Sequence, residues 1–418
     1  MKILRLTPHY YFENKSWPSR FDPLGGQQIQ VTNLAEWLSY KNVDQDILTT
    51  GFPGIKRKLK KKGNLKVYSV RRLTLPFKSK YSGTFLLDFS WALGSLFWIL
   101  KNFQKKYNII HLHSSGVIWP FILGIFASKI FKSKLITTIH CSRNFTYSTT
   151  NWFDLLINRL VIFMENKTIS RSEIVYVLTD RTRDKYVGRF PELVAKFKKL
   201  SDTVGNQHIN HMHTKPQCCA ENLPKVNFPS GDIILYLGRI SYEKGWETFV
   251  EVARNIARKD KNAKFLVCGD GPQKKELIRV VETYNISDRF FITGFVSKEI
   301  VPCVLNNSCV LVMPSKHEEL GGSAIEGIIA GVPIVASKVG GLQTLIKDSI
   351  SGYLVEPGDV NGFTSRVEKI LNEKDIAKRL VKKAKEEIKD IYQQDVVFMS
   401  LLKDYNSIVG GEDEALDG

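Results

Sequence analysis

Short apolar runs that end in glycine or a polar residue, and that alternate with helical segments, constrain the fold of this chain most. In the second half, strands are predicted at residues 233–237, 264–268, 289–293, 309–313 and 333–336, and helices at about 247–258, 273–284 and 323–330. Regular alternation of strands and helices is typical of a parallel sheet with helical connections. The sequence therefore predicts an α/β fold.

The first half repeats this pattern less cleanly, and the chain is long enough for two cores. Strands are predicted at residues 3–7, 46–50, 65–70, 109–112, 134–140 and 174–179, and a basic loop at 57–62. A length of 418 residues favours two domains, each with its own core. The predicted boundaries are a first domain at 1–200 joined by a helix at about 390–409, a linker at 201–229, a second domain at 230–389 and a disordered tail at 410–418.

Residues 314–331, PSKHEELGGSAIEGIIAG, predict a ligand site at the start of a helix. Gly321 and Gly322 would let an anion approach free backbone N–H groups at the helix N-terminus. Glu318 and Glu326 flank these glycines, and carboxylates accept hydrogen bonds from sugar hydroxyls. Phosphate beside sugar hydroxyls describes a nucleotide-sugar, although a glycine turn between strand and helix explains the segment equally well.

Two cations and two further glycine-ended strands favour the ligand site over the ordinary turn. Arg239 and Lys244 follow the run 233–237, and Gly269 and Gly294 close the next two strands. In an open parallel sheet, ligands bind beyond the carboxyl ends of the strands. The two cations would therefore lie where a diphosphate binds.

The order of these motifs resembles that of the retaining glycosyltransferases of family 4. The motifs are GRI-x3-KG from Gly238, GDGP from Gly269, F-x-x-GF from Phe291 and E-x7-E from Glu318. The segments HCSR at 140–143, EKGW at 243–246 and HEELGGSAIE at 317–326 are similar to the 2-deoxystreptamine glycosyltransferases of kanamycin, neomycin and, most closely, butirosin biosynthesis. The resemblance implies a GT-B fold, with two Rossmann-like doubly wound domains facing a central cleft and a C-terminal helix that crosses back to the first domain.

The resemblance also implies an activity and a set of site residues. The activity is retaining transfer of N-acetylglucosamine or glucose from a UDP-sugar to 2-deoxystreptamine, with no metal and no cofactor. The implied catalytic residues are His140, Arg239, Lys244 and Glu318. The implied donor-binding residues are Gly26, Val296, Leu320, Gly321, Gly322, Ser323 and Glu326.

The acceptor poses an electrostatic problem, because 2-deoxystreptamine carries two cationic amines and the chain has a net charge of +18. Salt screens charges beyond roughly 8–10 Å, so a local acidic pocket would suffice. By their loop positions, Glu13, Asp22 and Asp180 are the candidates, and the sequence does not choose between them.

The main alternative is a GT-B enzyme that glycosylates a lipid-linked or polysaccharide acceptor in cell-envelope assembly. The apolar segments 85–100 and 118–131 and the basic charge fit membrane contact, but both are shorter than the roughly 20 residues of a spanning helix. They are predicted to be buried helices. A non-catalytic relative of the fold is disfavoured by the intact pairs Arg239/Lys244 and Glu318/Glu326. No basic-aromatic alternation indicates nucleic acid, and no G-x-G-x-x-G follows the first strand, which excludes a nicotinamide enzyme.

Two sequence patterns resemble metal-binding motifs, but neither has the spacing or context that would predict a metal site. His208, His211, His213, Cys218 and Cys219 match no common zinc spacing. The triplet Asp44-Gln45-Asp46 resembles a metal-binding motif of another glycosyltransferase fold, but it leads into a predicted strand. Six cysteines without a C-x-x-C pair, and no secretory signal, indicate a cytoplasmic protein.

Overall fold

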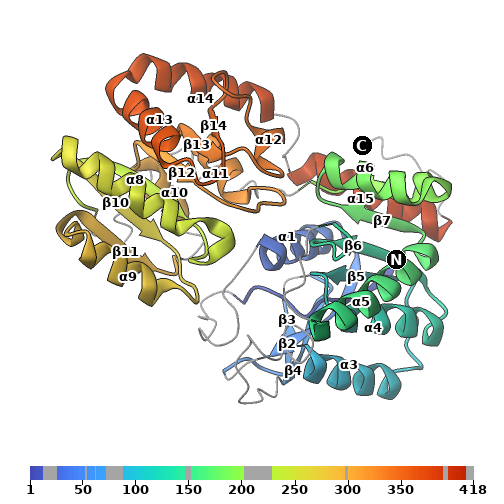
Figure 1. Cartoon of the computed structure of the whole chain (residues 1–418). Helices are drawn as coiled ribbons and strands as arrows, with labels where there is room; N and C mark the ends of the chain where they lie inside the picture. The colour runs from blue at the N-terminus through green and yellow to red at the C-terminus, as the bar shows by residue number, and fades with distance from the viewer. Residues whose placement is uncertain are drawn as a thin grey trace. The chain divides into compact units, whose positions relative to one another are not determined.

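The chain folds into two compact units (Figure 1). The computed structural model describes residues 1–12, 26–51, 54–61, 63–71, 88–145, 152–201, 228–296, 300–388 and 394–410. The first unit contains the described residues up to Ser201 and those from Val397 onward, and the second contains the described residues from 228 to Val396. Glu13, Asp22, the histidine–cysteine cluster at 208–219 and residues 411–418 of the predicted tail lie outside the described residues.

The first unit is built on an eight-stranded sheet. Its strands run in the order β3-β4-β2-β1-β5-β6-β7-β8, and all neighbours are parallel except β3 and β4. The strands are β1 Lys2–Leu6, β2 Asp44–Gly51, β3 Lys58–Lys60, β4 Leu65–Arg71, β5 Ile109–Ser114, β6 Lys134–Ile139, β7 Ile174–Val177 and β8 Phe197–Lys199. The helices are α1 Gly26–Tyr40, α3 Phe89–Lys101, α4 Ile118–Ile130, α5 Trp152–Arg171 and α6 Asp180–Arg189, followed by the 3-10 turn η2 Pro191–Lys196.

Helices cover both faces of this sheet. The side chains of α3, α4 and α5 share one apolar cluster with β1 and β5, and those of α1 share another with the opposite face of the same strands. The predicted strands are all present, but the predicted basic loop at 57–62 is wrong at its centre. Lys58–Lys60 is an antiparallel edge strand, because half-buried Leu59 pairs with buried Val67 while the flanking lysines point to solvent.

The triplet Asp44-Gln45-Asp46 is part of β2, as its apolar continuation predicted. Asp46 is buried, and it accepts hydrogen bonds from Tyr107 Oη at 2.6 Å and Lys105 Nζ at 3.2 Å. The Asp46 carboxylate therefore serves as a hydrogen-bond acceptor within the core.

The second unit is a six-stranded sheet in which every neighbouring pair is parallel. Its order is β11-β10-β9-β12-β13-β14. The strands are β9 Asp232–Leu237, β10 Ala263–Cys268, β11 Phe290–Gly294, β12 Val310–Met313, β13 Ile334–Ser337 and β14 Tyr353–Val355. The helices are α8 Trp246–Lys259, α9 Lys274–Thr283, α10 Val301–Asn306, α11 Gly322–Ala330, α12 Leu342–Leu345, α13 Val360–Asn372 and α14 Lys374–Ile388, with short 3-10 turns η3 Tyr242–Lys244 and η4 Ser287–Arg289. The chain order reverses between β9 and β12, which is where doubly wound folds bind their ligands.

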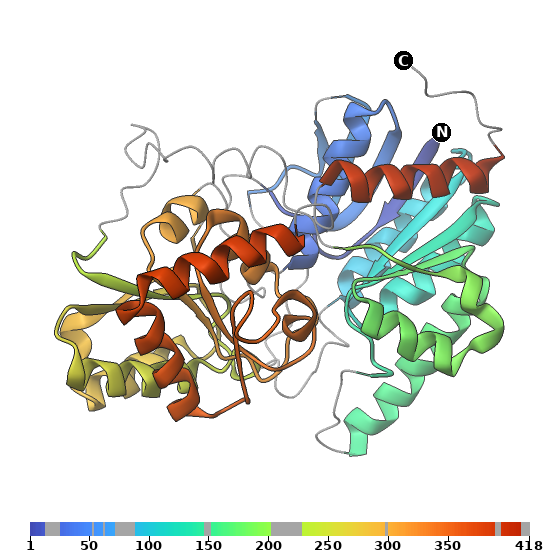
Figure 2. The ribbon, with the colours of Figure 1, turned by 90° about the horizontal axis from the view of Figure 1, so that it is seen from above.

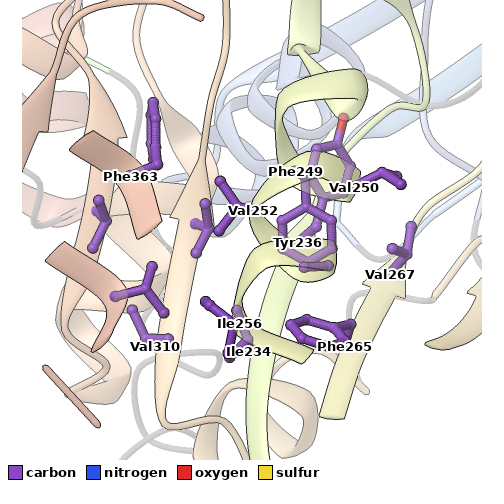
Figure 3. Close-up of a cluster of buried hydrophobic side chains, with 14 of the residues drawn as sticks. Ile234, Tyr236, Phe249, Val250, Val252, Ile256, Phe265, Val267, Val310 and Phe363 are labelled. Carbon is purple, nitrogen blue, oxygen red and sulfur yellow. The ribbon is translucent and has the colours of Figure 1, made fainter. Parts of the chain in front are cut away.

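The amphipathic helix α8 anchors one face of this second sheet (Figure 3). Phe249, Val252 and Ile256 recur at the spacing of one helix face and are all buried. They pack with Tyr236 of β9 and Phe265 of β10 in a single cluster. Each such side chain contributes roughly 1.5–3 kcal/mol when fully buried, so this cluster holds β9 and its following loop firmly in place.

The final helix, α15 Gln394–Val409, returns to the first unit (Figure 2). Phe398, Leu401 and Tyr405 are buried in one cluster with Ile3 of β1 and Ile109 of β5. This return, together with the two parallel α/β sheets, confirms the predicted fold class.

The apolar segments 85–100 and 118–131 contain α3 and α4, and the prediction that they are buried holds for one side only. Trp91 and Phe121 are fully buried, whereas Phe97 on α3 is 71% exposed and Ile122 on α4 is 36% exposed. Within the described residues, no helix is both long and apolar enough to cross a bilayer.

The cysteines only partly follow the sequence prediction. Cys268 and Cys309 are thiols, but Cys303 is disulfide-bonded, which the cysteine spacing did not predict.

Candidate functional site

In the second unit, the loops that follow β9 and β10 touch through their backbones. The Ile240 amide donates to the Asp270 carbonyl at 2.9 Å. A Cβ on Gly271 would lie 2.2 Å from the carbonyl oxygen of Ile240, so only glycine permits this approach. The GDGP motif is therefore explained first by close packing between two strand-end loops.

The loop after β9 also contacts the loop after β12. The Lys316 amide donates to the Glu243 carbonyl at 2.8 Å. Gly245 adopts a left-handed conformation with φ of 65°, and a Cβ there would lie 1.9 Å from the Pro314 carbonyl oxygen. These contacts place Lys244 beside the segment that carries Glu318.

Lys244 and Glu318 form an ion pair, with Lys244 Nζ 2.6 Å from Glu318 Oε2. The two side chains are only 28% and 12% exposed, so solvent screens the pair less than a surface pair. The sequence predicted that the Lys244 ammonium contacts a phosphate and that the Glu318 carboxylate contacts a sugar. The structure brings them together, so the carboxylate also holds the ammonium in position.

The helix α11 begins directly after this pair. Gly321 precedes it in a left-handed conformation with φ of 90°, and Leu320 is buried. Gly322 and Ser323 occupy the first turn, where backbone N–H groups have no acceptor within the helix. Glu326 lies one turn later and is half-buried. A cation and the positive end of a helix therefore lie within one loop of each other, which suits an anionic ligand.

The remaining donor-site candidates in this unit follow other strands of the same edge. Arg239 is half-buried in the loop after β9, and its carbonyl accepts a hydrogen bond from Tyr236 Oη at 2.7 Å. Val296 is half-buried two residues after β11 and packs against the core. Both lie at the carboxyl ends of strands, as predicted.

In the first unit, His140 immediately follows β6. Its amide donates to the Ser114 carbonyl at 2.9 Å, and its side chain is 8% exposed. Its Nε2 lies 3.1 Å from Nδ1 of His113 on β5. His140 is thus one end of a buried polar chain.

Arg5 of β1 lies at the other end of this chain. Its Nη1 is 2.9 Å from His111 Nδ1 and 2.8 Å from His113 Nε2, and its Nη2 donates to Gln45 Oε1 at 3.0 Å. Arg5 is fully buried, and within the described part of the chain no carboxylate forms an ion pair with it. Neutral acceptors alone therefore hold a permanent cation.

These contacts fix where the protons of the imidazoles lie. A guanidinium can only donate, so His113 Nε2 must accept, and the ring proton of His113 is on Nδ1. That proton is donated to His140 Nε2, so His140 carries its own proton on Nδ1. Among the described residues, none bonds to this Nδ1–H.

Burial keeps these histidines neutral. Desolvation, with Arg5 or His111 adding to it, holds the pKa values of His111 and His113 well below the usual range. Burial, with a smaller contribution from His9, lowers the pKa of His140 to about 3. Neutral rings are what the proton assignment requires, because a protonated His113 could not accept from Arg5.

A buried carboxylate holds the HCSR loop in place through hydrogen bonds. Glu165 of α5 accepts hydrogen bonds from the Arg143 amide at 3.3 Å, Ser142 Oγ at 3.2 Å and Tyr186 Oη at 2.5 Å. Burial raises the pKa of Glu165, and the same hydrogen bonds oppose that rise. Sequence reasoning missed this residue, because one glutamate on an apolar helix gives no pattern.

Sequence reasoning also missed Arg5, His111, His113 and Tyr405. A signal was present in IIHLHS, where His111 and His113 occur two residues apart and therefore point to the same face of a strand. Tyr405 Oη is 2.5 Å from His111 Nδ1 and joins the network from α15. Nothing local in the sequence connects residue 405 with residue 111.

The acceptor candidates receive little support. Asp180 begins α6 and pairs with Lys199 at 2.6 Å, which offsets its charge. Glu13 and Asp22 lie outside the described residues, and Gly26 is the first residue of α1. Among the described side chains, no three histidine, cysteine or carboxylate groups are placed to hold a metal ion.

Comparison with known proteins assigns the class. Residues 24–195 match Glycosyltransferase Family 4, and residues 221–387 match Glycosyl transferases group 1. The chain is 42% identical to a 2-deoxystreptamine N-acetyl-D-glucosaminyltransferase of Niallia circulans over 92% of its own length and 98% of the relative. It therefore belongs to the glycosyltransferases of family 4.

Other similar proteins agree with this assignment. The chain is 34% identical to a 2-deoxystreptamine N-acetyl-D-glucosaminyltransferase of Streptomyces fradiae, over 87% of this chain and 87% of the relative. It is 30% identical to a 2-deoxystreptamine glucosyltransferase of Streptomyces kanamyceticus, over 83% of this chain and 89% of the relative. Among solved structures, sucrose-phosphate synthase from Thermosynechococcus elongatus has a TM-score of 0.77 at 20% identity, covering 98% of this chain and all of that one. Anabaena HepE in complex with UDP and glucose has a TM-score of 0.69 at 15% identity, covering 97% and 100%. At these identities, the structures support the fold alone.

The buried histidines predict a stability that falls with acidity. Because the folded-state pKa values lie below the unfolded value of about 6.5, the unfolded chain binds more protons below that pH. Each histidine contributes stability that is fully present above pH 6.5 and is lost at up to about 1.4 kcal/mol per pH unit below it. When thermal unfolding is followed between pH 7 and pH 5, the loss of stability per pH unit should be smaller in His113→Asn than in the wild-type chain.

The control for this measurement is His317→Asn, which changes an exposed histidine of the second unit. It should keep the wild-type slope. Equal slopes in all three proteins would show that the buried cluster does not titrate in this way.

The Lys244–Glu318 pair predicts strongly non-additive kinetics. Lys244→Met and Glu318→Gln should each lower kcat/KM for glycosyl transfer about 10²–10³-fold, as loss of one preorganised donor does. Because the carboxylate acts partly through the ammonium it holds, the double variant should be little worse than the poorer single variant.

Lys259→Met is the matched control, because Lys259 pairs with Glu368 at 2.8 Å on the helices of the same unit. It should leave the kinetics unchanged. Multiplicative losses in the double variant would show that Lys244 and Glu318 act independently.

Proposed function

We propose that the chain transfers N-acetylglucosamine from UDP-N-acetylglucosamine to 2-deoxystreptamine, with retention of the anomeric configuration. The observation that carries this proposal is the 42% identity over nearly the full length of both chains to an enzyme named for that transfer. The similarity to the two N-acetylglucosaminyltransferases exceeds the similarity to the glucosyltransferase, which favours N-acetylglucosamine over glucose. An acceptor in cell-envelope assembly has no comparable support.

In this proposal, the second unit binds the donor. Departure of UDP leaves negative charge on the β-phosphate, and fixed donors placed beforehand stabilise that charge. Lys244, Arg239 and the first amides of α11 are suited to this task because they are held at one edge of the sheet. They provide the charge neutralisation that a divalent cation provides in other enzymes, so the reaction is proposed to need no metal.

Two carboxylates and two apolar residues are proposed to select the rest of the donor. Glu326, one turn into α11, holds the ribose hydroxyls. Glu318 keeps Oε2 on Lys244 and offers Oε1 to a hydroxyl of the transferred sugar. Val296, with Leu320 nearby in the same apolar cluster, borders the base and the sugar pocket.

His140 of the first unit is proposed to act as a hydrogen-bond donor and not as a general base. Its Nε2 is occupied by His113, and its available Nδ1 already carries a proton. The charge of Arg5, transmitted through His113, polarises this N–H and strengthens it as a donor. A hydroxyl of the substrates is then positioned by His140, while the leaving phosphate itself takes the acceptor proton. Gly26, at the start of α1, is proposed to let a backbone loop approach the diphosphate.

The first test uses the purified full chain with 2-deoxystreptamine and UDP-N-acetylglucosamine in the presence of EDTA. We expect mass spectrometry to detect a pseudodisaccharide, and the coupling of its anomeric proton in NMR to report an α-linkage. UDP-glucose in parallel should give a lower kcat/KM. UDP release without this product would refute the acceptor while keeping the transferase, and dependence on added Mg²⁺ would refute the metal-free mechanism.

A second test concerns His140. His140→Ala should bind UDP as tightly as the wild-type chain in calorimetry and yet lose transfer about 10²-fold or more, since one oriented donor is removed. His140→Asn retains an N–H near the position of Nδ1 and should recover part of the rate. Unchanged turnover in His140→Ala, or no difference between the two variants, would contradict the donor role.

A further inference from the structure

Three adjacent helices of the first unit expose several large apolar side chains. We call this surface the α3–α5 face, and its most prominent exposed side chains are Leu93, Phe97, Ile122, Leu156, Leu160 and Phe163. Phe97 is 71% exposed and Phe163 is 58% exposed. Soluble monomers rarely expose contiguous apolar patches beyond a few hundred Å², and larger ones mark interaction sites.

The apolar residues form stripes along the helices. On α3, Phe89, Leu93, Phe97 and Leu100 are exposed at spacings of three and four residues, so they lie along one side of the helix. On α5, Leu156, Leu160 and Phe163 repeat the same spacing.

Helix α4 joins these stripes into one surface. It packs between α3 and α5, and all three share one core cluster beneath (Figure 1). The rings of Phe89 on α3 and Trp119 on α4 lie 4.9 Å apart, and Ile122 is exposed one turn further along α4. The inner sides of the helices fill the core, so the exposed apolar side chains lie outside it.

Among the described side chains of these three helices, the exposed charges have one sign. Lys101 and Lys129 are exposed in the last turns of α3 and α4, and Arg159 and Lys167 are exposed along α5. Within the described part of the chain, none of these four forms an ion pair. Glu165, the one acidic residue among the described side chains of the three helices, is fully buried.

Helix polarity alone does not explain this pattern. Cations near helix C-termini are common because they offset the helix dipole, which accounts for Lys101 and Lys129. Arg159 and Lys167 lie away from the end of α5, however, beside Leu160 and Phe163. Lys167 Nζ lies 5.6 Å from the centre of the Phe163 ring. Mixed aromatic, leucine and lysine side chains are typical of surfaces that lie in the headgroup region of a bilayer.

We infer that the α3–α5 face docks the first unit peripherally onto an anionic membrane surface. The apolar stripes would enter the acyl boundary, while the lysine and arginine side chains extend to the lipid headgroups. A second copy of this chain is a poorer occupant, because two such faces would bring like charges together on a protein of net charge +18. The inference is independent of the proposed acceptor, because it concerns helices that carry none of the proposed catalytic residues.

The test is co-sedimentation of the full chain with vesicles of equal parts phosphatidylglycerol and phosphatidylcholine. The wild-type chain should pellet with these vesicles and not with phosphatidylcholine alone, and 0.5 M salt should release most of it. Phe97→Glu combined with Phe163→Glu should weaken binding at least about tenfold by placing charge in the apolar stripes. Lys101→Glu combined with Lys167→Glu should weaken it by a similar factor through lost electrostatic attraction.

Tyr40→Glu is the matched control, because Tyr40 is 70% exposed at the end of α1 in the same unit. It should bind as the wild-type chain does, and thermal melts should show that all variants fold. Three results would overturn the inference: no binding of the wild-type chain to anionic vesicles, equal binding by all variants, or a dimer in sedimentation velocity that the Phe97/Phe163 variant abolishes without any vesicle binding.

Discussion

Close approach of one backbone to another, at positions that only glycine can occupy, determines the architecture of the sheet edge where the donor is proposed to bind. Gly245 against Pro314, Gly271 against Ile240 and Gly340 against Glu318 each leave no room for a Cβ. These contacts fasten together the loops after four strands that are far apart in sequence. The side chains that these loops carry, Lys244 and Glu318 above all, are therefore positioned by main chain and not by their own flexibility. A site built in this way is preorganised, which is the property that electrostatic stabilisation of a leaving group needs.

The two units hold cations by contrasting means. In the second unit, Lys244 is paired with a carboxylate at partial exposure, so its charge is balanced by Glu318. In the first unit, Arg5 is fully buried among histidines, an amide and a tyrosine, none of which bears a negative charge. Burying a cation among neutral groups is costly. Here the cation lies at one end of a chain of two imidazoles whose other end is His140.

Much of the fold and part of the candidate site could be read from the sequence. The strands with apolar runs ended by glycine were all found, because burial on both faces of a parallel sheet leaves a continuous signal. The edge strands β3, β8 and β14 were missed because each has only three residues, too few to show a strand pattern. Lys244, Glu318 and the start of α11 were found as a motif, but their ion pair was not, since 74 residues separate the partners. The Arg5–His113–His140 chain was missed for the same reason, as register between β1, β5 and β6 is a property of the assembled sheet. The outer faces of α3 and α4 were misjudged because an apolar helix gives the same composition whether one side or both are covered.

The return of α15 to the first unit has a consequence for the order in which the protein is made. Tyr405 bonds to His111, and Phe398 and Leu401 fill the core beneath β1 and β5, so the core of the first unit is completed by α15. A ribosome will have released the whole of the second unit before it releases these residues. The second unit can therefore fold during synthesis, whereas the face of the first sheet that α15 covers stays open until α15 has been made. The contact of His111 with Tyr405 thus forms only after α15 has been synthesised, which ties the histidine network of the first unit to a helix that is made after the second unit.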